Sequence, residues 1–248
     1  MSDETDGERM TRLSRDRYER PLPKRFYKTV SISDDNTILL DSRVVKTPMK
    51  AILRLPTRGL AEAVADEWMA QGSHINPGVM PITRYANTAI DRAVSERQTV
   101  LDEIGRYAGN DLVCYRADRP PHLVAMQRLH WDPVLVYARR QLDAEFKATV
   151  GVVHVEQSTD AIDKIREATA KLDPYRLTAL FNLTTLTGSA LISVMLLRGA
   201  VTAVAAWDAA HVDEDYQILE WGWDEQAIAR RAGRRQDFDG LVSFINLL

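Results

Sequence analysis

The fold of this chain is organised around residues 177–197, LTALFNLTTLTGSALISVMLL, which carry no charged side chain. A helix that is apolar on nearly all sides belongs either in the core of a sizeable protein or in a membrane. Threonine and serine recur through this run, and their hydroxyls can bond back to helix carbonyls, so burying them is inexpensive. We therefore predict one buried helix over residues 177–197. A membrane span is the alternative, because about 20 apolar residues can cross a bilayer.

An acidic segment with two tryptophans follows, and its periodicity predicts a second helix. At about 100° per residue, one apolar stripe of this helix should pack on the core. The members of that stripe are Val212, Tyr216, Leu219 and Trp223. The opposite stripe carries Glu214, Ile218 and Trp221, and Asp213 and Gln217 lie between the two. The second stripe is either buried by another element or forms a recognition surface, with an aromatic anchor beside an acidic group.

Composition limits the class of protein. With 248 residues, 45% of them hydrophobic, the chain can bury one large core or two smaller ones. A net charge of −3 gives no electrostatic footprint for nucleic acid. The single cysteine, Cys114, excludes an intramolecular disulfide, and its apolar neighbours are typical of a buried thiol. One cysteine and five scattered histidines argue against a structural zinc site.

The N-terminal third predicts a tail and a small domain. Residues 1–24 mix charges with few large apolar side chains, so we expect a disordered tail. This segment has neither the apolar core of a secretory signal nor the composition of a mitochondrial presequence, and we expect a cytoplasmic protein. Between residues 26 and 55, β-branched runs and turn residues predict about four short strands in a meander. A helix that begins after Pro56 should cover them, which gives a small α+β domain over residues 25–80.

Beyond Pro81 the signals are helical, and we predict a larger all-helical domain over residues 81–248. The fold class is therefore α+β, with a small N-terminal β-meander and its covering helix, followed by the helical C-terminal domain. Within that domain we predict a long helix over 83–108, an apolar helix over 238–248, and a helix over 124–142 interrupted near Pro133.

Candidate chemistry is sparse. The chain has no phosphate-binding loop, nucleophile elbow or metalloprotease motif. His211 and Asp215 have a spacing that two metal ligands could use, but a lone histidine beside acids is usually a solvated pair, and we predict no metal. Asp213 and Glu214 could serve as an acid/base pair, although neighbouring helix residues point about 100° apart. A binding role is therefore favoured over catalysis.

A basic patch follows the acidic helix, and its members are Arg230, Arg231, Arg234 and Arg235. Most such patches are solvated, and an anion or an acidic partner is the alternative.

A set of short segments, considered together in order and spacing, resembles one family. These segments are Val45-Lys46-Thr47-Pro48, Leu55-Pro56-Thr57-Arg58, Met80-Pro81-Ile82-Thr83-Arg84, Ala86-Asn87-Thr88-Ala89-Ile90-Asp91-Arg92, Cys114-Tyr115-Arg116-Ala117, Trp131-Asp132-Pro133, Leu177-Thr178-Ala179-Leu180, Gly188-Ser189, Trp207, Asp213-Glu214, Gln217 and Trp221-Gly222. From about Phe26 onward the chain thus resembles the assembly chaperones of the F-type ATP synthase that bind its free alpha subunit. Because it lacks a mitochondrial presequence, it is most similar to a bacterial member.

The resemblance implies a chaperone rather than an enzyme, without a cofactor, which shields the alpha-subunit surface that later pairs with the beta subunit. It implies the same two-domain division, and it assigns the functionally important acid of the late helix to Glu214. We therefore predict that the alpha subunit is bound by Glu214, Ile218, Trp221, Asp213 and Gln217. We expect a monomer with no nucleic-acid partner and no stable membrane insertion.

Two other functions are left as alternatives. The first is a small carboxylate-dependent hydrolase that uses Asp213, Glu214 and His211. The second is a membrane-associated scaffold that uses residues 177–197.

Overall fold

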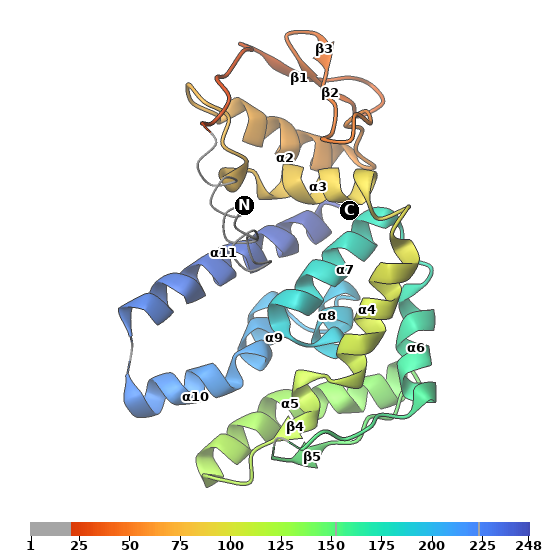
Figure 1. Cartoon of the computed structure of the whole chain (residues 1–248), viewed down its shortest axis with the longest axis vertical. Coiled ribbons are helices and arrows are strands. Elements are labelled where there is room, and N and C mark those ends of the chain that lie inside the picture. The colour runs from red at the N-terminus through yellow and green to blue at the C-terminus, as the bar shows by residue number, and fades with distance from the viewer. Residues whose placement is uncertain (1–20, 152, 223) are drawn as a thin grey trace, which may run out of the picture.

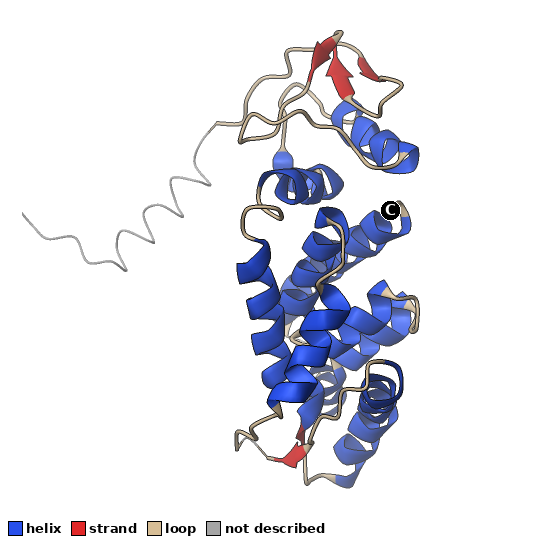
Figure 2. Ribbon diagram, turned by 90° about the vertical axis from the view of Figure 1, so that its right-hand side faces the viewer, coloured by secondary structure: helices blue, strands red, loops and turns tan. Residues whose placement is uncertain are grey.

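The computed structural model describes residues 21–151, 153–222 and 224–248 (Figure 1). The fold is α+β, as the sequence predicts, with a small N-terminal sheet followed mostly by helices. Figure 2 shows the strands of that sheet at one end of an elongated molecule and helices over most of the rest. Most of the predicted tail, and Trp223 of the predicted core stripe, lie outside the described residues.

The N-terminal sheet is an antiparallel meander of β1 (Val30–Ile32), β2 (Ile38–Leu40) and β3 (Arg43–Val44). The predicted covering helix is α2 (Arg58–Met69), which packs against β1 and β2. Thr57 begins this helix, because its side chain accepts a hydrogen bond from a first-turn amide. The fourth predicted strand is reduced to isolated bridges, which join Thr37 to Arg54 and Lys46 to Ile52.

The elements that follow are mainly helical. They are η1 (Pro77–Val79), α3 (Pro81–Asp91), α4 (Arg97–Gly109), η2 (Leu112–Cys114), β4 (Tyr115–Arg116), α5 (Pro121–Gln141), β5 (Thr149–Val150), α6 (Thr159–Thr169), α7 (Pro174–Thr187), α8 (Ala190–Leu197), α9 (Ala203–Ala210), α10 (Val212–Trp221) and α11 (Glu225–Asn246). β4 and β5 form a short parallel pair inside the part predicted to be all-helical. Figure 1 shows α7 and α8 at the centre of the helical part.

α3 lies between the two predicted domains. It packs against α2 on one side and against α7 and α11 on the other. The Glu67 carboxylate of α2 accepts hydrogen bonds from the backbone amides of Ile82 and Thr83, at 2.8 and 2.7 Å, and so caps the start of α3. A second long-range contact involves the C-terminal end of α11. There the carbonyl of Leu247 accepts a hydrogen bond from the hydroxyl of Thr57, at the start of α2. The division at residues 80 and 81 remains a prediction.

The prediction of a single helix over 83–108 is wrong, because the chain forms α3 and α4 with a turn between them. Asp91 at the end of α3 accepts hydrogen bonds from the Thr47 hydroxyl and from the amide of Met49. These contacts fix the end of α3 on the segment that follows β3, and α4 then runs in a different direction (Figure 1).

The predicted interruption at Pro133 is also wrong, because α5 continues through this residue. Proline in a helix removes one backbone hydrogen bond and normally kinks or ends the helix. Here the neighbouring side chains Trp131 and Val134 are buried, and the Trp131 indole donates to the carbonyl of Ala209 at 2.6 Å. Tertiary packing therefore holds the helix together across the proline.

Residues 177–197 are largely buried, as predicted, but they form two helices rather than one. Gly188 ends α7 with φ of 71°, a left-handed conformation that glycine adopts without steric strain. Ser189 begins α8, and its side chain accepts from the amide of Ile192 at 3.0 Å. Within the described residues, no helix combines the length and apolarity that a membrane crossing requires. The membrane-scaffold alternative relied on residues 177–197 as one apolar helix, whereas they form two helices with most side chains inside the protein.

A buried carboxylate fixes the position of this break. Asp111 is 0% exposed and accepts hydrogen bonds from the amides of Leu191, at 3.0 Å, and Val113, at 3.3 Å. The amide of Leu112 donates to the carbonyl of Gly188 at 3.3 Å. Burial raises the pKa of Asp111 to about 6, although the surrounding hydrogen bonds act in the opposite direction. Asp111 therefore joins η2 to the start of α8.

The left-handed turn at Gly188 gives a first prediction. Gly188→Ala should lower the free energy of unfolding by about 1–2 kcal/mol, the penalty for a side chain in this conformation. Gly233→Ala is the matched control, since Gly233 lies inside α11 with open space where its Cβ would be, and it should raise stability by about 0.5–1 kcal/mol. Urea denaturation of both variants measures the two effects, and the same sign in both would contradict this account.

Candidate functional site

The predicted acidic helix is α10, and it forms one side of a projecting arm. Three acids, Asp213, Glu214 and Asp215, stand in its first turn, where the helix dipole favours negative charge. Gly222, with φ of 81°, ends α10, and Asp224 caps α11, which turns back toward the body of the molecule (Figure 1). We call residues 212–235 the α10–α11 arm.

An ion network closes the base of the arm. The Arg231 guanidinium of α11 pairs with Asp215, and its Nη1 lies 3.1 Å from Oε2 of Glu214. Nη1 of Arg234 lies 3.6 Å from the same Glu214 oxygen. The side chain of Arg231 is only 15% exposed and that of Glu214 32%, so water screens this network less than a surface pair. Part of the predicted basic patch therefore pairs with acids of the same chain.

His211 lies beneath this network and is 2% exposed. Its Nδ1 lies 2.8 Å from the carbonyl oxygen of Trp207, so Nδ1 carries the proton and Nε2 is unprotonated. Nε2 faces Glu214 at 4.0 Å, and the imidazole stacks on the Trp207 ring with centroids 3.8 Å apart. Burial lowers the pKa of His211, which keeps this ring neutral near neutral pH.

The two neighbouring acids point to different helices. The Asp213 carboxylate accepts a hydrogen bond from Nε2 of Gln127 on α5 at 2.7 Å, whereas Glu214 faces α11. The sequence predicts this divergence, and the pair cannot act on one substrate atom. Asp215 pairs with Arg231 rather than with His211. Among the described residues there is no group of three or more His, Cys, Asp or Glu side chains that could hold a metal ion.

The predicted core stripe of α10 is only half correct. Val212 and Tyr216 are buried, the latter with its ring edge against His122 of α5, but Leu219 is 65% exposed. The reason is geometric, because α10 extends past the part of α5 on which it packs (Figure 1).

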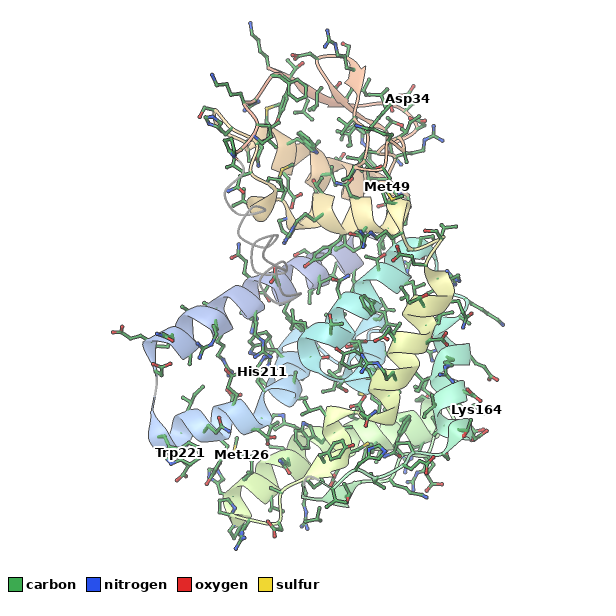
Figure 3. All side chains as sticks on the ribbon, viewed as in Figure 1. Asp34, Met49, Met126, Lys164, His211 and Trp221 are labelled. Atoms are coloured by element: carbon green, nitrogen blue, oxygen red, sulfur yellow. The ribbon has the colours of Figure 1, made fainter. Side chains whose placement is uncertain are left out.

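On the opposite stripe, Ile218 is half-buried, and Gln217, which lies between the two stripes, is exposed. Trp221 is 78% exposed and lies at the outer end of α10 (Figure 3). Trp221 therefore gives the outer end of α10, the tip of the arm, an exposed apolar side chain. Leu219, on the other stripe, and Ile228 of α11, which is 44% exposed, are further exposed apolar side chains of the arm.

Sequence reasoning missed the aromatic support of the arm. Trp207 of α9 is buried, with its ring against Phe238 of α11. The guanidinium carbons of Arg231 and Arg235 lie 5.7 and 5.2 Å from the centre of this ring, within the range of cation–π contacts. The spacing of Arg231, Arg235 and Phe238 places them on one face of α11, and this pattern was the available signal. The ring therefore supports the base of the arm.

The chain was compared with known proteins. Residues 24–139 match a family described as ATP12 chaperone protein. The crystal structure of Atp12 from Paracoccus denitrificans is similar, with 39% identity and a TM-score of 0.84 over 91% of this chain and 98% of that one. The Atu1473 protein of Agrobacterium tumefaciens is 41% identical, with a TM-score of 0.86 over 99% and 92%. The mitochondrial Atp12 of Schizosaccharomyces pombe is 24% identical over 226 residues, 84% of this chain and 78% of that one. The family is thus described as a chaperone and not as an enzyme.

The neutral state of His211 gives a second prediction, on pH dependence. The ordinary pKa of histidine is 6.5, and burial lowers the pKa of His211 in the folded protein, so the unfolded chain takes up this proton first as the pH falls. The stability that neutral His211 contributes is therefore fully present above about pH 6.5 and is lost as the pH falls through the lower, folded-state value.

We expect the free energy of unfolding to fall more in the wild type than in His211→Gln between about pH 7.5 and about pH 5.5. Urea titrations at both pH values measure the difference, because all other titrating groups are common to the two proteins. An equal fall in both would mean that His211 does not contribute to acid sensitivity.

Proposed function

The chain belongs to the ATP12 chaperone family, and we propose that it binds the free alpha subunit of the F-type ATP synthase during assembly of the enzyme. In this proposal it covers the alpha-subunit surface that later pairs with the beta subunit. An unassembled subunit exposes an apolar interface, which is prone to aggregation until it is covered. The observation that carries the proposal is Trp221, a large aromatic side chain that is 78% exposed on a projecting arm.

The tip of the arm has the chemistry of a binding anchor. Exposed tryptophan is enriched among the residues that dominate interface energies, especially when apolar neighbours exclude water around it. Ile218 and Gln217 precede Trp221 by three and four positions and so lie on the same side of α10, where Ile218 supplies an apolar neighbour and Gln217 offers an amide for hydrogen bonding. We propose that the alpha subunit contacts Trp221, Ile218 and Gln217.

The two acids of the predicted site act differently in this proposal. Glu214 and Asp213 hold α10 in place through Arg231 and Gln127, and so orient the tip toward the client. They are positioning residues, because their carboxylates are already engaged inside the protein. The fraction of Glu214 that is exposed also lets it meet a cation of the client at the edge of the contact.

Three further properties belong to the proposal. We infer a monomer in the cytoplasm, in which a sheet domain over residues 25–80 and a helical domain over residues 81–248 present one client surface. The buried, unpaired Cys114 agrees with a reducing compartment. The alternative of a carboxylate-dependent hydrolase is disfavoured, since Asp213 and Glu214 face different helices.

A third prediction tests the anchor. Trp221→Ala should weaken binding to purified alpha subunit by about 2 kcal/mol, or roughly thirtyfold. It should change the free energy of unfolding by less than about 0.5 kcal/mol, because the side chain is exposed. Val94→Ala is the control, since Val94 is 69% exposed in the turn between α3 and α4, and it should bind like the wild type. Wild-type affinity in Trp221→Ala would remove the tip from the binding surface.

A fourth prediction separates positioning from direct contact at Glu214. Glu214→Gln and Arg231→Gln should each lower stability by about 1–3 kcal/mol, because each breaks a partly buried charged contact. If Glu214 acts by holding α10, both variants should weaken alpha-subunit binding to a similar extent, and the double variant should be no worse than either. A loss of affinity in Glu214→Gln alone would instead indicate that its carboxylate contacts the alpha subunit.

A further inference from the structure

A polar hollow lies beside the base of the arm, where α3, α7 and α11 meet. Its volume is about 500 Å³, within the range of sites that hold small ligands or single side chains of a partner. We call it the α3–α7–α11 groove. Its polar lining comes from all three helices and consists of Arg84, Tyr85, Asn182, Thr185, Arg234 and Asp237. Leu186 and Leu241 add apolar surface.

The two guanidiniums of the groove are only weakly engaged. Nη2 of Arg84 lies 3.6 Å from Oδ1 of Asp237, and Nη1 of Arg234 lies 3.6 Å from Glu214. Nη2 of Arg234 also donates to the carbonyl of Leu186 at 3.4 Å. A charge-assisted hydrogen bond is normally about 2.7–2.9 Å long, so these contacts are all long. Because each guanidinium has five N–H donors, most of the donors on the two side chains are open to a ligand.

Two neutral donors stand beside the arginines. One amide hydrogen of Asn182 bonds to the carbonyl of Thr178 at 2.8 Å, which leaves the second hydrogen for a ligand. The Tyr85 hydroxyl donates to the carbonyl of Asp237 at a long 3.4 Å. Burial is the main cause that raises the pKa of Tyr85 to about 12, and the Asp237 carboxylate adds to it. This hydroxyl therefore keeps its proton at neutral pH. The lining itself carries two guanidiniums and one carboxylate, that of Asp237, and it therefore favours an anion.

We propose that the α3–α7–α11 groove binds a carboxylate side chain of an acidic polypeptide segment, between Arg84 and Arg234. Guanidinium forks match the planar geometry of a carboxylate, and the two leucines fit the methylene stem of a glutamate. That the ligand is a polypeptide rests on the proposed function, because a chaperone takes segments of its client. The groove then forms a second contact, separate from the apolar tip of the arm.

Nuclear magnetic resonance of the full chain labelled with ¹⁵N tests this proposal. The probe is the blocked peptide acetyl-Leu-Glu-Glu-Leu-amide, with acetyl-Leu-Gln-Gln-Leu-amide and inorganic phosphate as comparisons. We expect the glutamate peptide to shift the amide signals of Asn182 and of its neighbours in α7. Arg84→Gln and Arg234→Gln should weaken this binding about tenfold or more.

Asp237→Asn should strengthen binding of the glutamate peptide severalfold, because it removes the carboxylate that competes for Arg84. A purely structural role for Asp237 would not give this increase. Arg230→Gln is the matched control on the same helix, since its side chain is 68% exposed and does not line the groove, and it should bind like the wild type. Thermal unfolding verifies that each variant is folded.

Several results would overturn the proposal: no shifts with the glutamate peptide, equal shifts with the glutamine peptide, no gain in Asp237→Asn, or tighter binding of phosphate than of the peptide. Wild-type affinity of Arg84→Gln for the alpha subunit would overturn the client assignment. The proposed function is tested separately, because Trp221→Ala should bind the glutamate peptide normally and the alpha subunit weakly.

Discussion

The buried carboxylate of Asp111 is the constraint on which the helical part of the fold depends. It meets the backbone amides at the start of α8, the position where a helix carries partial positive charge. α8 in turn contacts α4, α5, α7 and α9, so an error in its starting residue would displace four neighbours. An anion inside a protein is unfavourable, and its raised pKa reflects this. Backbone donors that have no partner within α8 offset the penalty and make the arrangement specific.

Asp111 also illustrates which features of the fold could be predicted from the sequence and which could not. Residues 177–197 are buried because they lack charge, and this property is local. Gly188 and Ser189 also carried a local signal for the end of α7, since glycine followed by serine is a common sequence for ending one helix and starting another. This signal was not used, because the uncharged run is long enough for a single helix. Asp111 could not be linked to Leu191 from sequence, because 80 positions separate them and only the packed structure brings them together.

Two other predictions, on the helix around Pro133 and on the single helix over 83–108, were wrong because contacts between distant segments decide the structure there. The helix across Pro133 is maintained by burial of Trp131, and the end of α3 is set by contacts of Asp91 with the segment after β3. For the candidate site, periodicity correctly located α10 and its buried Val212 and Tyr216. The exposure of Leu219 depends on where α5 begins, and the pairing of Glu214 with Arg231 depends on where α11 turns back. No local pattern specifies either position. Arg234 also joins the arm to the α3–α7–α11 groove, since it faces Glu214 and lines the hollow.

The contact between Thr57 and Leu247 has a consequence for how the chain folds. It joins the start of α2 to the second-last residue across 190 positions of sequence. Contacts of such high sequence separation form slowly, because most of the chain must be ordered before the ends can meet. During synthesis the N-terminal sheet and α2 emerge first, yet the surface on which they close is made last. The native contact between α2 and Leu247 can therefore be completed only after α11 has left the ribosome.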